Sequence, residues 1–238
     1  MSKISKSPVP RMLWLFGLMT VLGMLGLPST ILAQQPPLRQ LVEVRTRLGT
    51  MVVALYNETP EHRDRFISRV KAHEMDSLLF HRVVPGLGIE GGDPASKNAA
   101  PGIPLGLDVD SIGLPLTVVP GLIHRKAVLT ASPAGDGPEL ARRSHRDLFL
   151  IVLGVPYESS ELDRVAARNT ALGAPFTYSE QDRRIYATVG GQPRLDGSYT
   201  VFGEVVDGLE VIDAIAASPC NTWDRPMEDI RMYMRLLP

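Results

Sequence analysis

From residue 41 onward, short segments that are either alternately apolar and polar or largely apolar end near glycine or proline. A period of two is the pattern of a half-buried β-strand and a short apolar run fits a buried one, so these segments predict strands. They cover a hairpin over 41–56, which turns at Gly49, and then 78–84, 87–91, 126–131, 148–153, 199–205 and 230–236. Many short strands with few helices between them favour an antiparallel barrel or sandwich over a parallel α/β sheet.

Three segments have a helical pattern instead. Residues 57–75 predict a helix with Thr59 as its cap and Pro60 at its first position, where the missing N–H costs nothing. Residues 208–217 predict a second helix, and the charged, amphipathic stretch 158–184 predicts one or two surface helices. The Pro- and Gly-rich residues 94–125 predict a long structured loop, and residues 132–147 a polar loop.

The N-terminus follows a third pattern. Lys3, Lys6 and Arg11 precede an uncharged apolar run over 12–27, and Ile31-Leu32-Ala33 fits a cleavage site. We therefore expect a signal peptide over 1–33, a linker over 34–40 and one domain over 41–238. The protein would then be exported to the periplasm or cell envelope. The alternative is an uncleaved anchor, since a bilayer is spanned by roughly 20 apolar residues.

Charge, cysteine content and histidine spacing argue against nucleic-acid partners, an internal disulfide and metal sites. Removal of residues 1–33 changes the formal charge from −1 to −4 and leaves no basic stripe, so we expect no nucleic-acid partner. The Arg142, Arg143 and Arg146 cluster is interpreted as part of a solvated loop. One cysteine, Cys220, excludes an internal disulfide and a cysteine-based zinc site. The five histidines lack metal-ligand spacing, so no metal is expected.

Residues 80–94, FHRVVPGLGIEGGDP, hold the candidate chemistry. Their G-x-G-x-x-G spacing is that of a dinucleotide-binding turn, but Pro94 and the loop after it prevent a helix from starting there. A calcium loop beginning at Asp108 fails as well, because its fifth and twelfth positions would be Ile112 and Val119. Arg82, set among apolar residues, is left either as a structural ion pair or as the residue that does the chemistry.

FHRVV followed by GGDP resembles the cyclophilin family of peptidyl-prolyl isomerases. The resemblance extends over 41–238 through four further segments in family order: GTMVVALYNETPEHRDRFI, FLIVLG, LDGSYTVFGEVVDGLEVIDAI and DRPMEDIRM. It implies a mainly β fold: a closed eight-stranded antiparallel barrel capped by two helices, with a helical surface insertion at 158–187. It also implies an isomerase of X–Pro bonds that needs no cofactor or metal. Such a protein would act as a monomer on proline-containing polypeptides and assist the folding of exported proteins.

The resemblance assigns residue roles, with departures. Arg82 matches the family's catalytic arginine, and the substrate-binding residues would be Leu87, Glu90, Ala131, Phe149, Leu150, Leu195 and Tyr199. Leu87 and Leu150 stand where the family has aromatic residues, Gly88 where it has methionine, and Glu90 where it has glutamine. Ionised glutamate only accepts hydrogen bonds, so Glu90 could grip Arg82 in a bidentate pair and compete with the substrate.

These departures leave two further hypotheses open. One is a catalytically weak or inactive cyclophilin-like module that binds peptides or acts as a chaperone. The other is a purely structural role, in which Arg82 and Glu90 form an ion pair on the barrel surface.

Overall fold

A computed structural model describes residues 38–107, 112–135 and 139–238. The predicted signal peptide and most of the predicted linker lie outside the described residues. Within the described part, no helix has the length and apolar character needed to cross a membrane.

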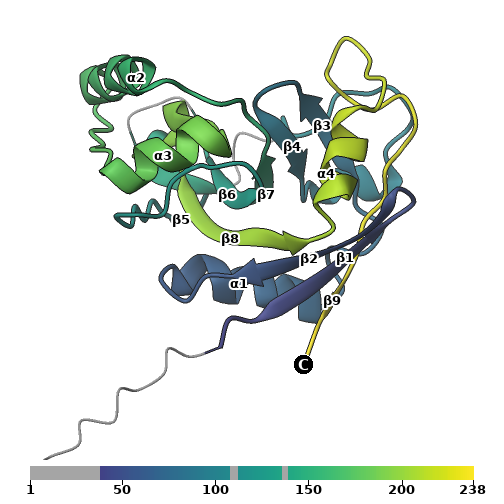
Figure 1. Ribbon diagram of the computed structural model, residues 1–238. Coiled ribbons are helices and arrows are strands. Elements are labelled where there is room, and N and C mark those ends of the chain that lie inside the picture. The colour runs from purple at the N-terminus through teal and green to yellow at the C-terminus, as the bar shows by residue number, and fades with distance from the viewer. Residues whose placement is uncertain (1–37, 108–111, 136–138) are drawn as a thin grey trace, which may run out of the picture. The chain divides into compact units, whose positions relative to one another are not determined.

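The fold is mainly β and antiparallel (Figure 1). Its main sheet has the strand order β3-β4-β7-β6-β8-β2-β1-β9, and β5 pairs with β7 beside this path. The strands are β1 (Leu41–Thr46), β2 (Gly49–Leu55), β3 (Phe80–Val84), β4 (Gly88–Gly91), β5 (Ile112–Pro115), β6 (Val128–Pro133), β7 (Arg143–Val152), β8 (Thr200–Asp207) and β9 (Tyr233–Leu236).

The barrel is open rather than closed, which corrects the prediction. The two ends of the sheet, β3 and β9, share no strand ladder in the described chain. They are linked just before β9 by one bridge, Leu79 to Arg231, and by hydrogen bonds such as Phe80 N to Ile230 O at 2.9 Å. The contact falls upstream of β9, so the eight strands of the path curl toward closure without completing it.

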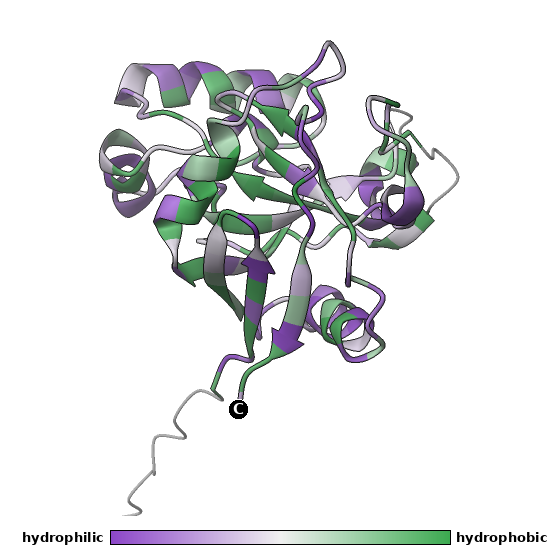
Figure 2. Ribbon diagram, turned by 90° about the vertical axis from the view of Figure 1, so that its right-hand side faces the viewer, coloured by the Kyte–Doolittle hydropathy of each residue, from purple (hydrophilic) through white to green (hydrophobic). Residues whose placement is uncertain are grey.

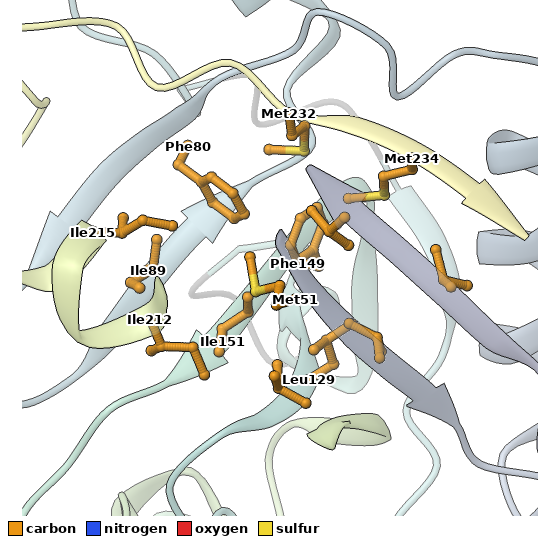
Figure 3. Close-up of a cluster of buried hydrophobic side chains, with 14 of the residues drawn as sticks. Met51, Phe80, Ile89, Leu129, Phe149, Ile151, Ile212, Ile215, Met232 and Met234 are labelled. Atoms are coloured by element: carbon orange, nitrogen blue, oxygen red, sulfur yellow. The ribbon is translucent and has the colours of Figure 1, made fainter. Parts of the chain in front are cut away.

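Two helices bury their apolar faces against the curled sheet. The helix α1 (Pro60–Lys71) packs against β8 and β9, and α4 (Leu209–Ala216) packs against β2, β3 and β4. Figure 3 shows the core they share, in which Ile212 and Ile215 of α4 lie among side chains from several strands. Colouring by hydropathy shows apolar residues on the strands inside the fold and polar residues on the outer helix faces (Figure 2).

Three local predictions need correction. Thr59 occupies the N-cap position of α1, but its hydroxyl donates to Val201 O at 3.2 Å instead of capping the helix. The strand predicted at 148 begins at Arg143, because β5 and the end of β6 pair with its first half. Arg143 and Arg146 are therefore exposed strand residues, and the predicted loop 94–125 contains β5.

Residues 158–188 form two helices with a small core of their own. The helix α2 (Ser159–Ala171) begins at a capping box with Glu158, and α3 (Glu180–Thr188) at one with Ser179. Buried Ile123, Leu162, Tyr178 and Tyr186 make up this core. The helix α2 also packs on a short 3₁₀ turn, η3 (Pro193–Leu195), just before β8. We call residues 158–188 the two-helix segment.

Candidate active groove

The strand register places one row of side chains on the outer face of the sheet. Arg82 on β3 lies opposite Glu90 on β4, Glu90 lies opposite Leu150 on β7, and Leu150 lies opposite Thr130 on β6. Residues directly opposite each other in a ladder point to the same face. Val83, which follows Arg82, belongs to the buried core, so the row that holds Arg82 is the outer one.

Arg82 lies between two carboxylates and keeps access to solvent. Its Nη1 is 3.5 Å from Glu90 Oε2 and its Nε is 3.7 Å from Asp224 Oδ2, with 42% of the side chain exposed. The predicted contact with Glu90 is therefore present. It is a single long ion pair instead of the bidentate grip that we considered, and it leaves much of the guanidinium side chain exposed.

Glu90 is buried and has two further neighbours. Ser132 donates its hydroxyl to Glu90 Oε1 at 3.0 Å, and His81 Nε2 lies 4.0 Å from Oε2. Burial lowers the pKa of His81, so this imidazole is neutral at pH 7 and adds no positive charge. Arg82 and Ser132 therefore hold the carboxylate from two sides, and the outer face beside Arg82 is net acidic once Asp224 is included.

An apolar cluster covers the rest of this outer face. It brings together four residues that the sequence assigned to substrate binding: Leu87, Leu150, Leu195 and Tyr199. We call it the outer apolar cluster, and its other members are Tyr56, Leu122, Val128, Val152 and Val201. The side chains of Leu150 and Leu195 are deeply buried, with 4% and 7% of the residues exposed. These two leucines are thus closely packed among the other members of the cluster.

Gly88 leaves room for the side chain of Leu150. A Cβ atom at Gly88 would lie 2.7 Å from Leu150 Cδ1 and 2.6 Å from Ile151 O. Real Cβ atoms do not approach other heavy atoms so closely, so Leu150 occupies the space that a larger residue at position 88 would need. Leu150 therefore packs directly against Gly88 and fills space that a side chain at position 88 would otherwise occupy.

Two predicted pocket residues lie elsewhere. Ala131 and Phe149 pair with each other across β6 and β7, and both belong to the inner core. The Phe149 ring packs edge-on against Phe66 and Phe80 at 5.7 and 6.1 Å. The structure therefore removes Ala131 and Phe149 from the groove and makes them core residues.

Sequence reasoning missed Ser132 and Asp224. The period of two along β6 could have found Ser132, because it shares a face with Thr130. Asp224 has no local signal: a loop far along the chain brings it to Arg82, where its backbone oxygen accepts from Val83 N at 2.8 Å. The glycine spacing has no phosphate geometry, since Gly88 and Gly91 lie in β4 and only a five-residue 3₁₀ helix follows.

Comparisons with known proteins agree with this geometry. The family described as "Cyclophilin type peptidyl-prolyl cis-trans isomerase/CLD" matches residues 41–120 and 165–234. The peptidyl-prolyl cis-trans isomerase ppi1 of Schizosaccharomyces pombe is 27% identical over 192 residues, which are 80% of this chain and 94% of that protein. A Streptococcus pyogenes protein, whose name provisionally assigns it both phosphatase and peptidyl-prolyl isomerase functions, is 28% identical over 194 residues. This match covers 79% of the present chain but only 37% of the streptococcal protein.

Solved structures agree on the fold. A Cryptosporidium parvum cyclophilin-type isomerase, crystallised in the presence of the dipeptide Ala-Pro, has a TM-score of 0.57 at 19% identity. The similarity covers 84% of this chain and 99% of that one. With the family match extending over more than half of its residues, this chain belongs to the cyclophilin-type peptidyl-prolyl cis-trans isomerase family.

Proposed function

We propose that this protein rotates X–Pro peptide bonds in exported polypeptides, with Arg82 as the catalytic residue. One observation carries the proposal: Arg82 lies on the outer face of the sheet, two strands from Leu150 and the outer apolar cluster. Neighbouring strands are about 4.8 Å apart, so a stretch of two or three substrate residues can reach from the outer apolar cluster to the guanidinium.

The chemistry needs no nucleophile. Rotation about a peptide bond has a barrier of about 18–20 kcal/mol, because the C–N bond has partial double-bond character. A protein lowers this barrier by binding the twisted amide more tightly than either planar form. The outer apolar cluster would hold the proline ring, and the N–H groups of Arg82 would donate to the substrate where conjugation is lost.

The substrate class follows from the N-terminal pattern. A cationic start followed by an apolar run and a small-residue site is typical of a chain that is exported. Proline isomerisation takes tens of seconds or more when it is uncatalysed, which is slow enough to limit folding. The protein would therefore assist the folding of other exported chains in the periplasm or cell envelope.

A second candidate function is peptide binding with little turnover. The burial of Leu150 and Leu195 favours it, because these two side chains expose little apolar surface to a proline ring. The carboxylate of Glu90 favours it too, since it neutralises part of the charge that Arg82 would offer to the substrate. Both candidates use the same groove and differ in rate.

Isomerisation of a short Ala–Pro peptide by the full chain, followed by NMR exchange spectroscopy, tests the proposal. Arg82→Ala should reduce kcat/KM by about a hundredfold or more, the usual effect of removing one transition-state hydrogen-bond donor. Arg45→Ala is the matched control, because Arg45 also forms a 3.5 Å surface ion pair, with Glu43 on β1. A parent chain that binds the peptide without accelerating exchange would support the second candidate and refute the first.

A further inference from the structure

A buried polar cluster lies beneath the groove and has no part in the proposed reaction. His124 Nδ1 is 2.6 Å from Asp196 Oδ1, and His124 Nε2 is 3.0 Å from Thr130 Oγ1. The order Thr–His–Asp is that of a nucleophile, a base and an orienting acid. Thr130 is 0% exposed and His124 and Asp196 are 1% exposed, so a substrate cannot reach the hydroxyl and the cluster is not hydrolytic.

Asp196 joins this cluster to the two-helix segment. Its Oδ1 also accepts from the backbone N–H of His124 at 3.0 Å, and its Oδ2 accepts from the hydroxyl of Tyr186 on α3 at 2.6 Å. Tyr186 is fully buried. Burial, reinforced by the nearby charge of Asp196, raises the pKa of Tyr186 far above its usual value, so the phenol keeps its proton and stays a donor.

Two more side chains of the segment hold the same turn. Asn169 Nδ2 on α2 donates to Pro193 O and to Asp196 O, both at 3.1 Å. The hydroxyl of Tyr178 donates to Pro193 O, also at 3.1 Å. Backbone carbonyls that the tight turn leaves buried thus find their donors in the two-helix segment.

This turn contains one residue of the groove, Leu195, and contacts another, Tyr199. Leu195, a member of the outer apolar cluster, directly precedes Asp196, and its carbonyl accepts from Tyr199 N at 3.1 Å. The His124 ring also packs edge-on against the Tyr199 ring, with centroids 6.0 Å apart. A continuous set of contacts therefore runs from α3 through Asp196 to both groove side chains.

We infer that the two-helix segment sets the position of the proline pocket, and that Tyr186 is a positioning residue for Leu195 and Tyr199. The link to turnover rests on the proposed function; the link to groove geometry does not. In this arrangement, side chains of the segment hold the turn over 193–196 by hydrogen bonds, and Leu195 of that turn belongs to the groove. Loss of one of these bonds should weaken substrate binding more than it slows turnover of the bound complex, because Arg82 is held separately by β3 and β4.

The test compares Tyr186→Phe with Tyr157→Phe in the full chain. Tyr186→Phe removes the donor to Asp196 and keeps the ring. Tyr157 is the matched control, because its ring packs against Tyr186 at 6.3 Å while its hydroxyl reaches Gln192 Oε1 at 3.5 Å and not Asp196. We expect Tyr186→Phe to raise KM for an Ala–Pro peptide about three- to tenfold, because part of the free energy of the lost charged hydrogen bond should be lost from substrate binding. The kcat should stay nearly unchanged. Tyr157→Phe should leave both parameters unchanged.

Amide chemical shifts of Leu195 and Tyr199 give a second measurement that does not need turnover. Tyr186→Phe should move both, and Tyr157→Phe should move neither. If Tyr186→Phe does not fold, Asn169→Leu removes two other bonds to the turn and takes its place. A lowered melting temperature with unchanged KM and unchanged groove shifts would make the segment merely structural and overturn the inference.

The proposed function can fail separately. If the parent chain does not accelerate exchange, isomerisation is refuted, and the inference is then judged on the groove shifts and on the Kd for the same peptide. Shifts and Kd that differ between Tyr186→Phe and Tyr157→Phe would support it, and identical values would overturn it.

Discussion

Replacing Glu90 with glutamine should raise isomerase activity. The carboxylate lies 3.5 Å from Arg82 Nη1 and draws the guanidinium toward β4. Glutamine has nearly the same shape and can still accept the hydrogen bond from Ser132, but it carries no charge. The substitution therefore tests the effect of the charge with little change in packing.

The ion-pair geometry sets the size of the effect. Two unit charges 3.5 Å apart attract by about 5 kcal/mol at an effective dielectric constant of 20 and by about 1 kcal/mol in water. The lower value applies here, because 42% of the Arg82 side chain is exposed and solvent screens the pair. Exposed pairs typically contribute about 0.2–1 kcal/mol, so kcat/KM should rise by about 1.5- to 5-fold.

The assay is peptide exchange at low and high salt, with Glu43→Gln as control. Glu43 is also a strand carboxylate paired with an arginine, Arg235, at 2.7 Å, but it lies on β1. Added salt should raise the activity of the parent toward that of Glu90→Gln, because salt screens the ion pair between Arg82 and Glu90. The variant lacks this pair, so salt should affect its activity less. Unchanged or lower activity in Glu90→Gln would show that the carboxylate orders Arg82 productively, and would refute the competition argument.

Two predictions concern stability. Burial lowers the pKa of His62 to about 4 in the folded chain, against a usual pKa of about 6.5 in the unfolded chain. Between these two pH values only the unfolded chain is protonated at His62, which favours unfolding. The folded state should lose up to about 3 kcal/mol between pH 6.5 and pH 4, and urea titrations of His62→Phe against the parent should show that this loss is removed; parallel pH curves would contradict it. Gly88→Ala should destabilise the fold by about 1–3 kcal/mol, because the new Cβ would meet Ile151 O and Leu150. In a Leu150→Ala background, which is itself destabilised by the lost packing, Gly88→Ala should cost less than in the parent but still some stability, since the backbone oxygen stays in place; no cost in that background would assign the clash to Leu150 alone.

The fold was predictable because its signals are local. Alternation placed the hairpin 41–56, and the observed β1 and β2 fall within it. Proline and glycine marked the helix boundaries, as Pro60 does for α1. The incomplete closure of the barrel between β3 and β9 and the extra length of β7 were not predictable, because both depend on which distant strand is available to pair.

The groove divides in the same way. Arg82 could be found from the sequence, since an arginine in an apolar strand is conspicuous. Its second carboxylate, Asp224, arrives from a loop whose position depends on the whole fold. Ala131 was placed one residue away from the outer face, and a shift of one residue in a strand reverses which side of the sheet a side chain occupies. Ser132 is the β6 residue that contacts Glu90.

The smaller side chains in the pocket alter its shape more than its polarity. Leucine for an aromatic residue and glycine for methionine would leave a cavity if the neighbours stayed in place, and cavities in apolar surroundings are costly. Leu150 instead packs against Gly88 and is itself only 4% exposed, so it offers a substrate little apolar surface. A larger share of the substrate's orientation therefore falls to Tyr199, which is only partly buried and whose backbone N–H donates to the carbonyl of Leu195. A segment that fixes Leu195 and Tyr199, as the two-helix segment does through Asp196, therefore matters more in this protein than it would beside a pocket lined by larger aromatic side chains.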